Sequence, residues 1–192
     1  VQRRWALGTF DCKTAFLTGK SHDREIYVLP PKEGLPGVEQ GSLLKLLKGA
    51  YGLREAPRLW YLRAKEILLE AGFTELKTAK SVFVLRDPKT RILQGLLVLH
   101  VDDACYGGHG TAWTKALEKL RKSFTIGKEE YGTFTFLGGR VVQHPAYSIE
   151  LDQHDYVRAL EKVPICKARR KQIKDVLTPK ELHDYRSLVG QL

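Results

Sequence analysis

The sequence predicts an α+β protein in which an antiparallel sheet is covered on one face by helices. Segments with the alternation of strands occur in pairs around short turns, and segments with the apolar spacing of helices are interleaved with them. The chain has 192 residues, of which 43 % are hydrophobic and 28 % are charged. This composition is typical of a globular protein that is long enough to bury a sizeable core.

Alternating or continuous apolar segments between turn signals predict the strands. They cover residues 5–11, 25–29, 42–47, 81–85, 92–101, 133–142 and 148–151. The strand at 25–29 is stopped by Pro30 and Pro31, and a loop rich in glycine and proline follows it. The segment 92–101 is nearly all apolar, so we expect it to be buried on both faces.

Four helices are predicted from apolar periodicity. They cover residues 57–71, 111–124, 153–163 and 179–192. Pro57 suits a first helical turn and Gly72 suits a helix end, which makes 57–71 the clearest of the four. Trp113, Leu117 and Leu120 share one stripe of the second helix.

The charge of the chain favours an acidic partner, most simply nucleic acid. Lys and Arg number 32 against 22 Asp and Glu, a net charge of +10, and basic residues concentrate at 45–65 and again at 167–174. No apolar run is long enough for a transmembrane helix. Three cysteines without a CxxC pair argue for a reducing compartment. Because the chain opens on Val1 and contains no Met, we interpret it as a piece of a longer polypeptide.

Acidic residues stand at the ends of two predicted strands. Asp102 and Asp103 follow the apolar strand directly, and Asp11 ends the strand at 5–11. Two carboxylates this close repel unless a cation neutralises them, and Mg²⁺ prefers such oxygen ligands. If the two strands are neighbours, Asp11 and Asp102 converge on a two-metal site for phosphoryl transfer. An Asp-Asp pair alone is also typical of a solvated turn.

Six segments, in order, resemble those of Ty1/copia-type retrotransposon reverse transcriptases. The most distinctive is 47–61, which reads LKGAYGLREAPRLWY. The others are 10–19 (FDCKTAFLTG), 100–103 (HVDD), 136–139 (FLGG), 152–157 (DQHDYV) and 185–192 (YRSLVGQL). The resemblance covers nearly the whole chain, which makes chance agreement very improbable.

The resemblance implies the palm of a right-hand polymerase, with partial fingers and the start of a thumb or connection segment. The implied division is a palm region at 1–163 and a basic linker with the start of the thumb or connection at 164–192. The implied activity is RNA-directed DNA synthesis, in which a primer 3′-hydroxyl attacks a dNTP held by two Mg²⁺ ions, with Mn²⁺ as a substitute. RNA template, DNA primer, integrase and RNase H are the implied partners, and no membrane is involved. The implied location is intracellular, in a cytoplasmic particle with a nuclear stage.

The resemblance also assigns residues to roles. Asp11, Asp102 and Asp103 match the catalytic, metal-binding acids. Phe16 matches a bulky residue that leaves no room for a 2′-hydroxyl. It binds the nucleotide together with Tyr51, Gly52, Arg54 and Lys128. The primer and template positions are His100, Val101, Arg58, Arg63, Lys65, Phe136, Leu137, Gly138 and Gly139.

Some features depart from the family pattern. His100 stands where an aromatic residue usually heads the metal hairpin, and only ten residues precede Asp11, so we expect the preceding fingers strands to be missing. His and Cys residues near the acids lack the spacing of a zinc site. The alternative function is therefore an inactive retroelement remnant that binds nucleic acid through its basic surfaces, and a further one is a purely structural remnant.

Overall fold

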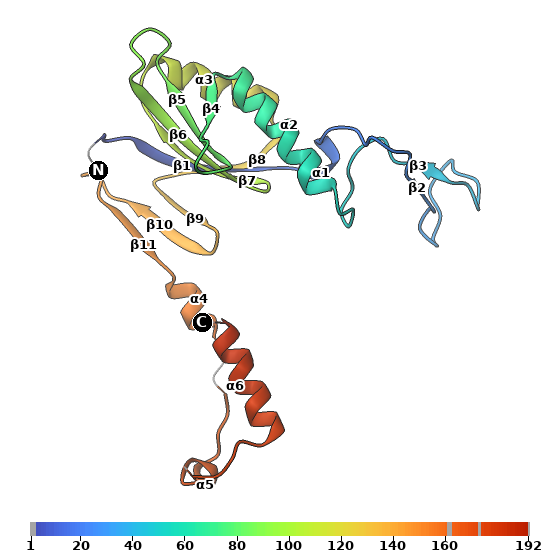
Figure 1. The fold of residues 1–192 in the computed structure, drawn as a ribbon, viewed down its shortest axis with the longest axis vertical. Coiled ribbons are helices and arrows are strands. Elements are labelled where there is room, and N and C mark those ends of the chain that lie inside the picture. The colour runs from blue at the N-terminus through green and yellow to red at the C-terminus, as the bar shows by residue number, and fades with distance from the viewer. Residues whose placement is uncertain (1–2, 161–162, 173, 192) are drawn as a thin grey trace.

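A six-stranded antiparallel sheet forms the framework of the fold in a computed structural model that describes residues 3–160, 163–172 and 174–191 (Figure 1). Strand β1 (Ala6–Cys12) lies between β7 (Asp103–Gly108) and β8 (Ile126–Tyr131), although both come about a hundred residues later in the chain. The spatial order is β4 (Phe73–Glu75), β5 (Val82–Arg86), β6 (Leu93–His100), β7 (Asp103–Gly108), β1 (Ala6–Cys12) and β8 (Ile126–Tyr131). Together with its helices, this sheet confirms the predicted α+β class.

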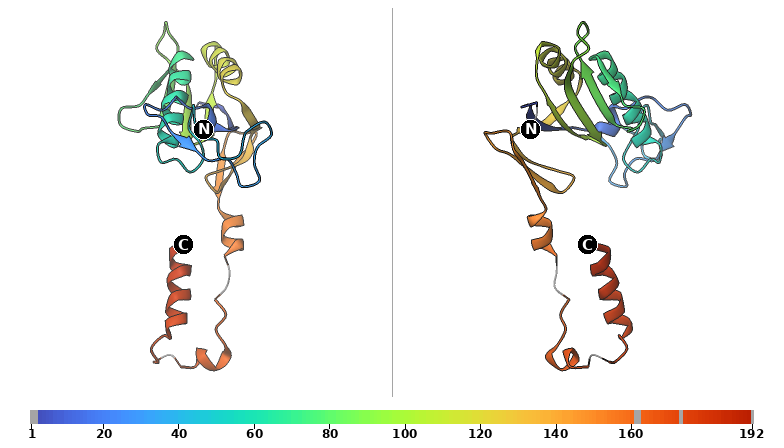
Figure 2. Two further views of the ribbon diagram at one scale, coloured as in Figure 1. Left: turned by 90° about the vertical axis from the view of Figure 1, so that its right-hand side faces the viewer. Right: turned by 60° about the vertical axis from the view of Figure 1, so that its left-hand side comes forward.

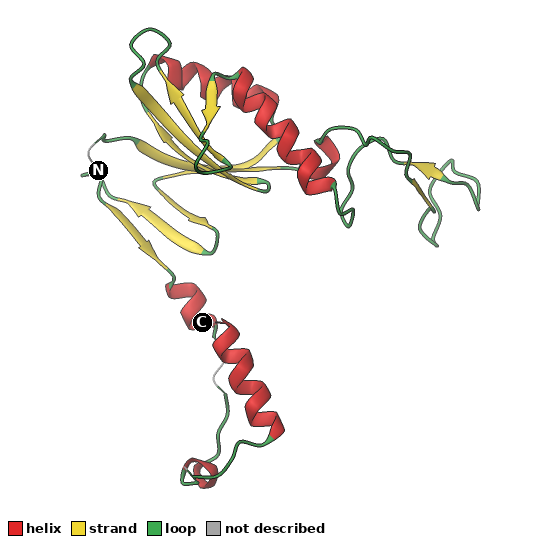
Figure 3. Cartoon of the chain, viewed as in Figure 1, coloured by secondary structure: helices red, strands yellow, loops and turns green. Residues whose placement is uncertain are grey.

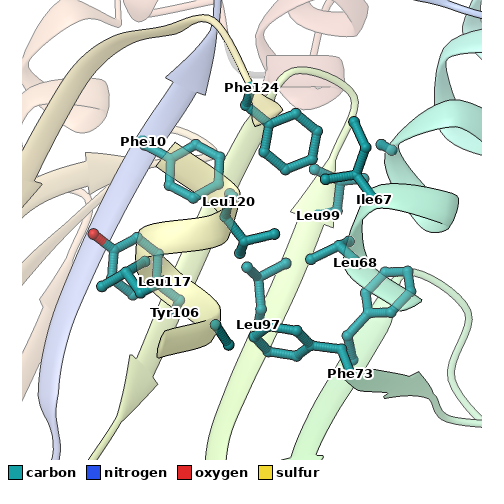
Figure 4. Packing of buried hydrophobic residues seen from close by; sticks show 14 of the residues in the cluster. Phe10, Ile67, Leu68, Phe73, Leu97, Leu99, Tyr106, Leu117, Leu120 and Phe124 are labelled. Atoms are coloured by element: carbon teal, nitrogen blue, oxygen red, sulfur yellow. The ribbon is translucent and has the colours of Figure 1, made fainter. Parts of the chain in front are cut away.

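Two long helices cover one face of this sheet (Figures 1 and 3). They are α2 (Ala56–Glu70) and α3 (Thr111–Ser123), each within one residue of its predicted bounds. Their buried sides meet the sheet in a core where Leu68, Leu97 and Leu120 are completely buried (Figure 4). Trp113 of α3 lies against two glycines that face each other across β6 and β7, Gly95 and Gly108.

The prediction that 92–101 is buried on both faces is wrong. Leu97 and Leu99 point into the core, whereas Leu96 and Val98 are each 37 % exposed on the opposite side. Helices lie on one face of the sheet only, so the outward-facing residues of β6 remain open to solvent, including the apolar Leu96 and Val98. We call this uncovered side the open face.

A second, three-stranded antiparallel sheet follows β8. It consists of β9 (Thr133–Phe136), β10 (Gly139–Gln143) and β11 (Ile149–Asp152). The predicted strand at 133–142 is thus two strands joined by a tight turn, in which Leu137 and Gly138 have φ angles of 52° and 77°. Positive φ at both turn residues matches the twist of a two-residue hairpin. The predicted hairpin across residues 144–146 is confirmed between β10 and β11.

The remaining elements are short or lie outside both sheets. They are α1 (Ala15–Thr18), β2 (Tyr27–Val28), β3 (Leu44–Lys45), α4 (His154–Ala159), α5 (Lys167–Arg170) and α6 (Pro179–Gln191). The predicted helix at 153–163 is shorter than expected, and 161–162 lie outside the described residues, as does Leu192 of the last predicted helix. Figure 2 shows α6 standing apart from the six-stranded sheet. Within the described ranges, none of the helices combines the length and the apolar character that crossing a membrane requires.

Candidate active site

Strand pairing brings the three predicted acids to one end of the six-stranded sheet. Asp11 and Asp103 are register partners across β1 and β7, and Asp102 lies in the turn just before β7. The backbone N–H of Cys12 donates to the carbonyl of Asp102 at 2.7 Å, which ties the turn to the end of β1. All three acids are half-buried. We call this the acid-bearing end of the sheet.

The turn that carries Asp102 is fixed by helix α2. Val101 has a φ of 53°, which is unusual for a β-branched residue, and its carbonyl accepts a hydrogen bond of 2.6 Å from the indole Nε1 of Trp60. Trp60 is buried on α2. His100, the last residue of β6, is exposed and is the register partner of Asp103. The helix therefore determines where the two adjacent acids lie.

Negative charge accumulates at the acid-bearing end. Burial, followed by the neighbouring Asp102 and Asp11 carboxylates, raises the pKa of Asp103, while His100 opposes this rise. Burial, followed by the same three acids, raises the pKa of the Cys12 thiol to about 12. A bound cation would relieve this repulsion, which is a physical reason for a metal ion to bind here.

The Asp11 carboxylate is turned toward β8. The backbone N–H of Lys128 donates a hydrogen bond to Asp11 Oδ1. A Cβ atom built on Gly127 would lie 2.2 Å from Asp11 Oδ2, so the carboxylate occupies space that only a glycine leaves free. Nothing in the family motifs pointed to Gly127. An isolated glycine in a polar strand is nevertheless a recognised signal of a bulge or of a close approach.

The acids suit a divalent metal ion in chemistry and register, but their side chains are not gathered around one point. Within residues 3–160, 163–172 and 174–191, no group of three or more His, Cys, Asp or Glu side chains is arranged to hold an ion. Carboxylate oxygens are the ligands that Mg²⁺ and Mn²⁺ prefer. Asp11 would have to turn from β8 toward Asp103 to complete such a group.

Two of the predicted nucleotide-binding residues contact each other. The rings of Phe16 in α1 and Tyr51 lie 4.9 Å apart at an angle of 55°, although Tyr51 is 65 % exposed. Gly49 allows its segment to approach the backbone of α1 closely, because a Cβ there would lie 2.8 Å from the Phe16 carbonyl oxygen. Gly52 has a φ of 90° and Arg54 is exposed nearby in the chain.

Lys128 lies beside Asp11 through its backbone rather than its side chain. Its ammonium group forms an ion pair of 2.8 Å with Glu130 on the same strand. The sequence assigned Lys128 to the nucleotide through its side chain, and that assignment stays a prediction.

Besides His100 and Val101, the predicted primer and template residues fall into two groups. Phe136, Leu137, Gly138 and Gly139 form the turn between β9 and β10, where Leu137 is exposed. The basic residues of α2 differ in their surroundings. Arg58 is exposed, Arg63 lies 3.7 Å from Glu66, and Lys65 forms a 2.6 Å ion pair with Glu75.

Glu75 is held by several donors. Burial opposes its ionisation, but hydrogen bonds from Lys65, from the Tyr61 hydroxyl and from the Ser81 amide outweigh that effect and lower the pKa of Glu75 to about 2. The Lys65 ammonium group is therefore held in an ion pair with Glu75 within the protein.

Comparison with known proteins defines the class. Residues 1–176 match the family model described as reverse transcriptase (RNA-dependent DNA polymerase), and the chain belongs to that family. Relatives among the retrovirus-related Pol polyproteins of plant transposons confirm the resemblance to the Ty1/copia type.

Three relatives illustrate the match. The Retrovirus-related Pol polyprotein from transposon RE2 of Arabidopsis thaliana is 29 % identical over 100 % of the chain and 14 % of that protein. The corresponding protein from transposon RE1 of the same plant is 30 % identical over 82 % of the chain and 10 % of its own length. That from transposon TNT 1-94 of Nicotiana tabacum is 29 % identical over 88 % of the chain and 12 % of its own length. The chain thus spans only a small part of each of these polyproteins.

Proposed function

We propose that the chain is the palm of an RNA-directed DNA polymerase and adds deoxynucleotides to the 3′-hydroxyl of a primer. The observation that supports this proposal most strongly is the pairing of Asp11 with Asp103, with Asp102 in the adjoining turn. In this proposal residues 1–163 form the palm with part of the fingers, and 164–192 form a basic linker and the start of a thumb or connection segment.

Asp11 and Asp102 are the proposed principal ligands of two divalent ions, and Asp103 is a secondary ligand or orienting group. Mg²⁺ ions bound there, or Mn²⁺ in their place, would activate the primer hydroxyl and stabilise the leaving pyrophosphate. The chain contributes a rigid base for these acids, because Trp60 fixes the Val101 carbonyl and the Cys12 amide fixes that of Asp102.

The paired rings of Phe16 and Tyr51 are the proposed wall of the nucleotide site. A ring braced by a second ring cannot move aside easily, so Phe16 would exclude a 2′-hydroxyl and favour deoxynucleotides. Gly52 allows close approach of the backbone, and Arg54 would contact phosphate or stack on a base. Lys128 would lie on the pyrophosphate side.

The proposed nucleic-acid surface combines two turns with three basic residues of α2. The turns are His100–Val101 and Phe136–Gly139, and Arg58, Arg63 and Lys65 would contact phosphates of the template. The proposed partners are RNA template, DNA primer, dNTPs and the integrase and RNase H of the same polyprotein, acting in a cytoplasmic particle with a nuclear stage.

Primer extension on an RNA template tests the proposal. We expect extension in Mg²⁺ or Mn²⁺ by a polyprotein that contains this chain. Asp102→Asn should lower its rate on the order of a thousandfold, because it removes a metal ligand from the transition state. Asp23→Asn changes an exposed acid in the loop before β2 and serves as the matched control. Equal rates for wild type and Asp102→Asn would contradict the metal assignment.

Binding of nucleic acid without catalysis is the second candidate, favoured by the net charge of +10. In this case the chain would bind RNA with an affinity that falls steeply as the salt concentration rises. No polyprotein that contains the chain would extend a primer. A salt-independent affinity would count against phosphate contacts in either reading.

A further inference from the structure

Strand β8 contains a bulge opposite Asp11. Across β1 and β8, Phe10 is paired with Glu129 and Cys12 is paired with Ile126, so two residues of β8, Gly127 and Lys128, stand opposite Asp11 alone. Bulges of this kind redirect side chains and occur often beside active sites. The bulge turns the backbone N–H of Lys128 toward the Asp11 carboxylate.

Gly127 supplies room rather than a special backbone conformation. Its φ lies outside the positive range, so an alanine would be compatible with the backbone of the strand. The obstacle to a side chain is Asp11 itself, whose Oδ2 and Cγ would lie 2.2 Å and 2.9 Å from the added Cβ. One carboxylate oxygen therefore accepts the Lys128 amide, while the other fills the space above Gly127.

The charges on the two sides of β1 explain why Asp11 turns this way. Phe10 and Cys12 point into the core, so the side chain between them lies on the open face and can turn toward either neighbouring strand. Toward β7 it would approach the carboxylates of Asp102 and Asp103. Toward β8 it finds an amide donor, which favours that orientation as long as no cation neutralises the acids.

We propose that the bulge of Gly127 and Lys128 is a resting position for Asp11, and that a divalent cation must draw this carboxylate away to complete the metal site. The inference rests on the proposed function, since it concerns the same three acids. Gly127 and the Lys128 amide act through Asp11 and are positioning groups. In this view the side chain of Asp11 moves between β8 and β7, and the backbone stays in place.

Gly127→Ala tests the proposal because a single methyl group removes the resting position. With that position filled, Asp11 has to turn toward Asp103 before any metal binds, so we expect Mn²⁺ to bind about tenfold more tightly than to wild type. Binding is followed through the electron paramagnetic resonance signal of free Mn²⁺, with the whole chain. Gly190→Ala is the matched control, because an added methyl group there meets nothing within 4 Å. Thermal unfolding of both variants checks that the fold is intact.

The amide of Lys128 provides a second measurement that does not depend on the variant at position 127. We expect its proton resonance in the ¹H–¹⁵N spectrum to lie downfield in wild type. It should move upfield when Asp11→Ala removes the acceptor, and also when Mg²⁺ is added to wild type. An amide that responds to neither change would overturn the proposed resting position.

The outcomes separate this inference from the function on which it rests. If Asp102→Asn weakens Mn²⁺ binding and Gly127→Ala weakens it too, or leaves it unchanged, the acids bind metal but the bulge does not withhold Asp11. If neither wild type nor Gly127→Ala binds Mn²⁺, the metal assignment itself fails, and the inference fails with it.

Discussion

Cys12 shows how the position of a single residue decides its chemistry. Its side chain lies in the core, 2 % exposed, while its chain neighbour Asp11 and the register partner of Asp11, Asp103, lie on the other side of the sheet. Burial and these negative charges raise the pKa of the thiol to about 12. The thiol is therefore a small neutral core group at physiological pH, not a metal ligand or a nucleophile.

This shift predicts how stability depends on pH. In the unfolded chain the Cys12 thiol loses its proton near its ordinary pKa of 9.0, whereas in the folded protein it keeps the proton up to about 12. The unfolded state then binds fewer protons, so the free energy of unfolding should fall as pH rises above 9. The fall should be steeper in wild type than in Cys12→Ala by up to about 1.4 kcal/mol per pH unit. Urea unfolding at pH 8 to 11 measures this, and parallel curves would show that the thiol titrates normally.

At the scale of elements, α3 packs on the sheet through the ring of Trp113. Gly95 and Gly108 are register partners on β6 and β7, and the ring of Trp113 lies over both. A Cβ on Gly95 would lie 2.1 Å from this ring, and one on Gly108 would lie 2.2 Å from it. The same two strands end in the turn of Asp102, so this packing also supports the acid-bearing end.

Gly108→Ala should therefore destabilise the protein by about 1–3 kcal/mol, because the methyl group overpacks a closely filled core. The midpoint of chemical or thermal unfolding measures the effect. In the double variant with Trp113→Leu, the loss caused by Gly108→Ala should shrink, since the smaller side chain leaves room. A Gly108→Ala variant as stable as wild type would show that Trp113 can move aside freely.

Some helices and strands could be predicted from their local sequence, and others could not. Helices α2 and α3 were predicted closely, because apolar periodicity and end signals such as Pro57 and Gly72 are local properties. Strands β7 and β8 were not predicted. The sequence of β7 is DACYGG, mostly small residues, and that of β8 is the polar IGKEEY. Both are strands because they pair with β1, and local sequence carries no signal of that pairing.

At the scale of the whole molecule, the side chain of Gln143 links the two sheets, beside the backbone hydrogen bonds of Gly132 with Leu7 and Gln143. The amide of Gln143 accepts a hydrogen bond of 2.9 Å from the Leu7 N–H and donates one of 2.8 Å to the Trp5 carbonyl. It takes the place of a neighbouring strand where β8 has ended. This contact ties the end of β10, the strand that begins after the Leu137–Gly138 turn, to the start of β1.

Gln143→Ala should loosen the three-stranded sheet without unfolding the other one. We expect amide hydrogen exchange in β9 and β10 to accelerate about tenfold, while β6 and β7 keep their protection. Gln153→Ala, an exposed glutamine after β11, is the matched control. Uniform acceleration across both sheets would mean that Gln143 supports the entire fold instead.

The sequence by itself determined the α+β class, the two long helices and the family, because composition, periodicity and motif order are properties of the chain; the role of the three acids stays a prediction. Only the tertiary structure decided that β6 is buried on one face. The same holds for the pairing of Asp11 with Asp103 and for the turn of its carboxylate toward Gly127. These features depend on which strands become neighbours and on which charges then face each other, and both are set by contacts between residues far apart in the chain.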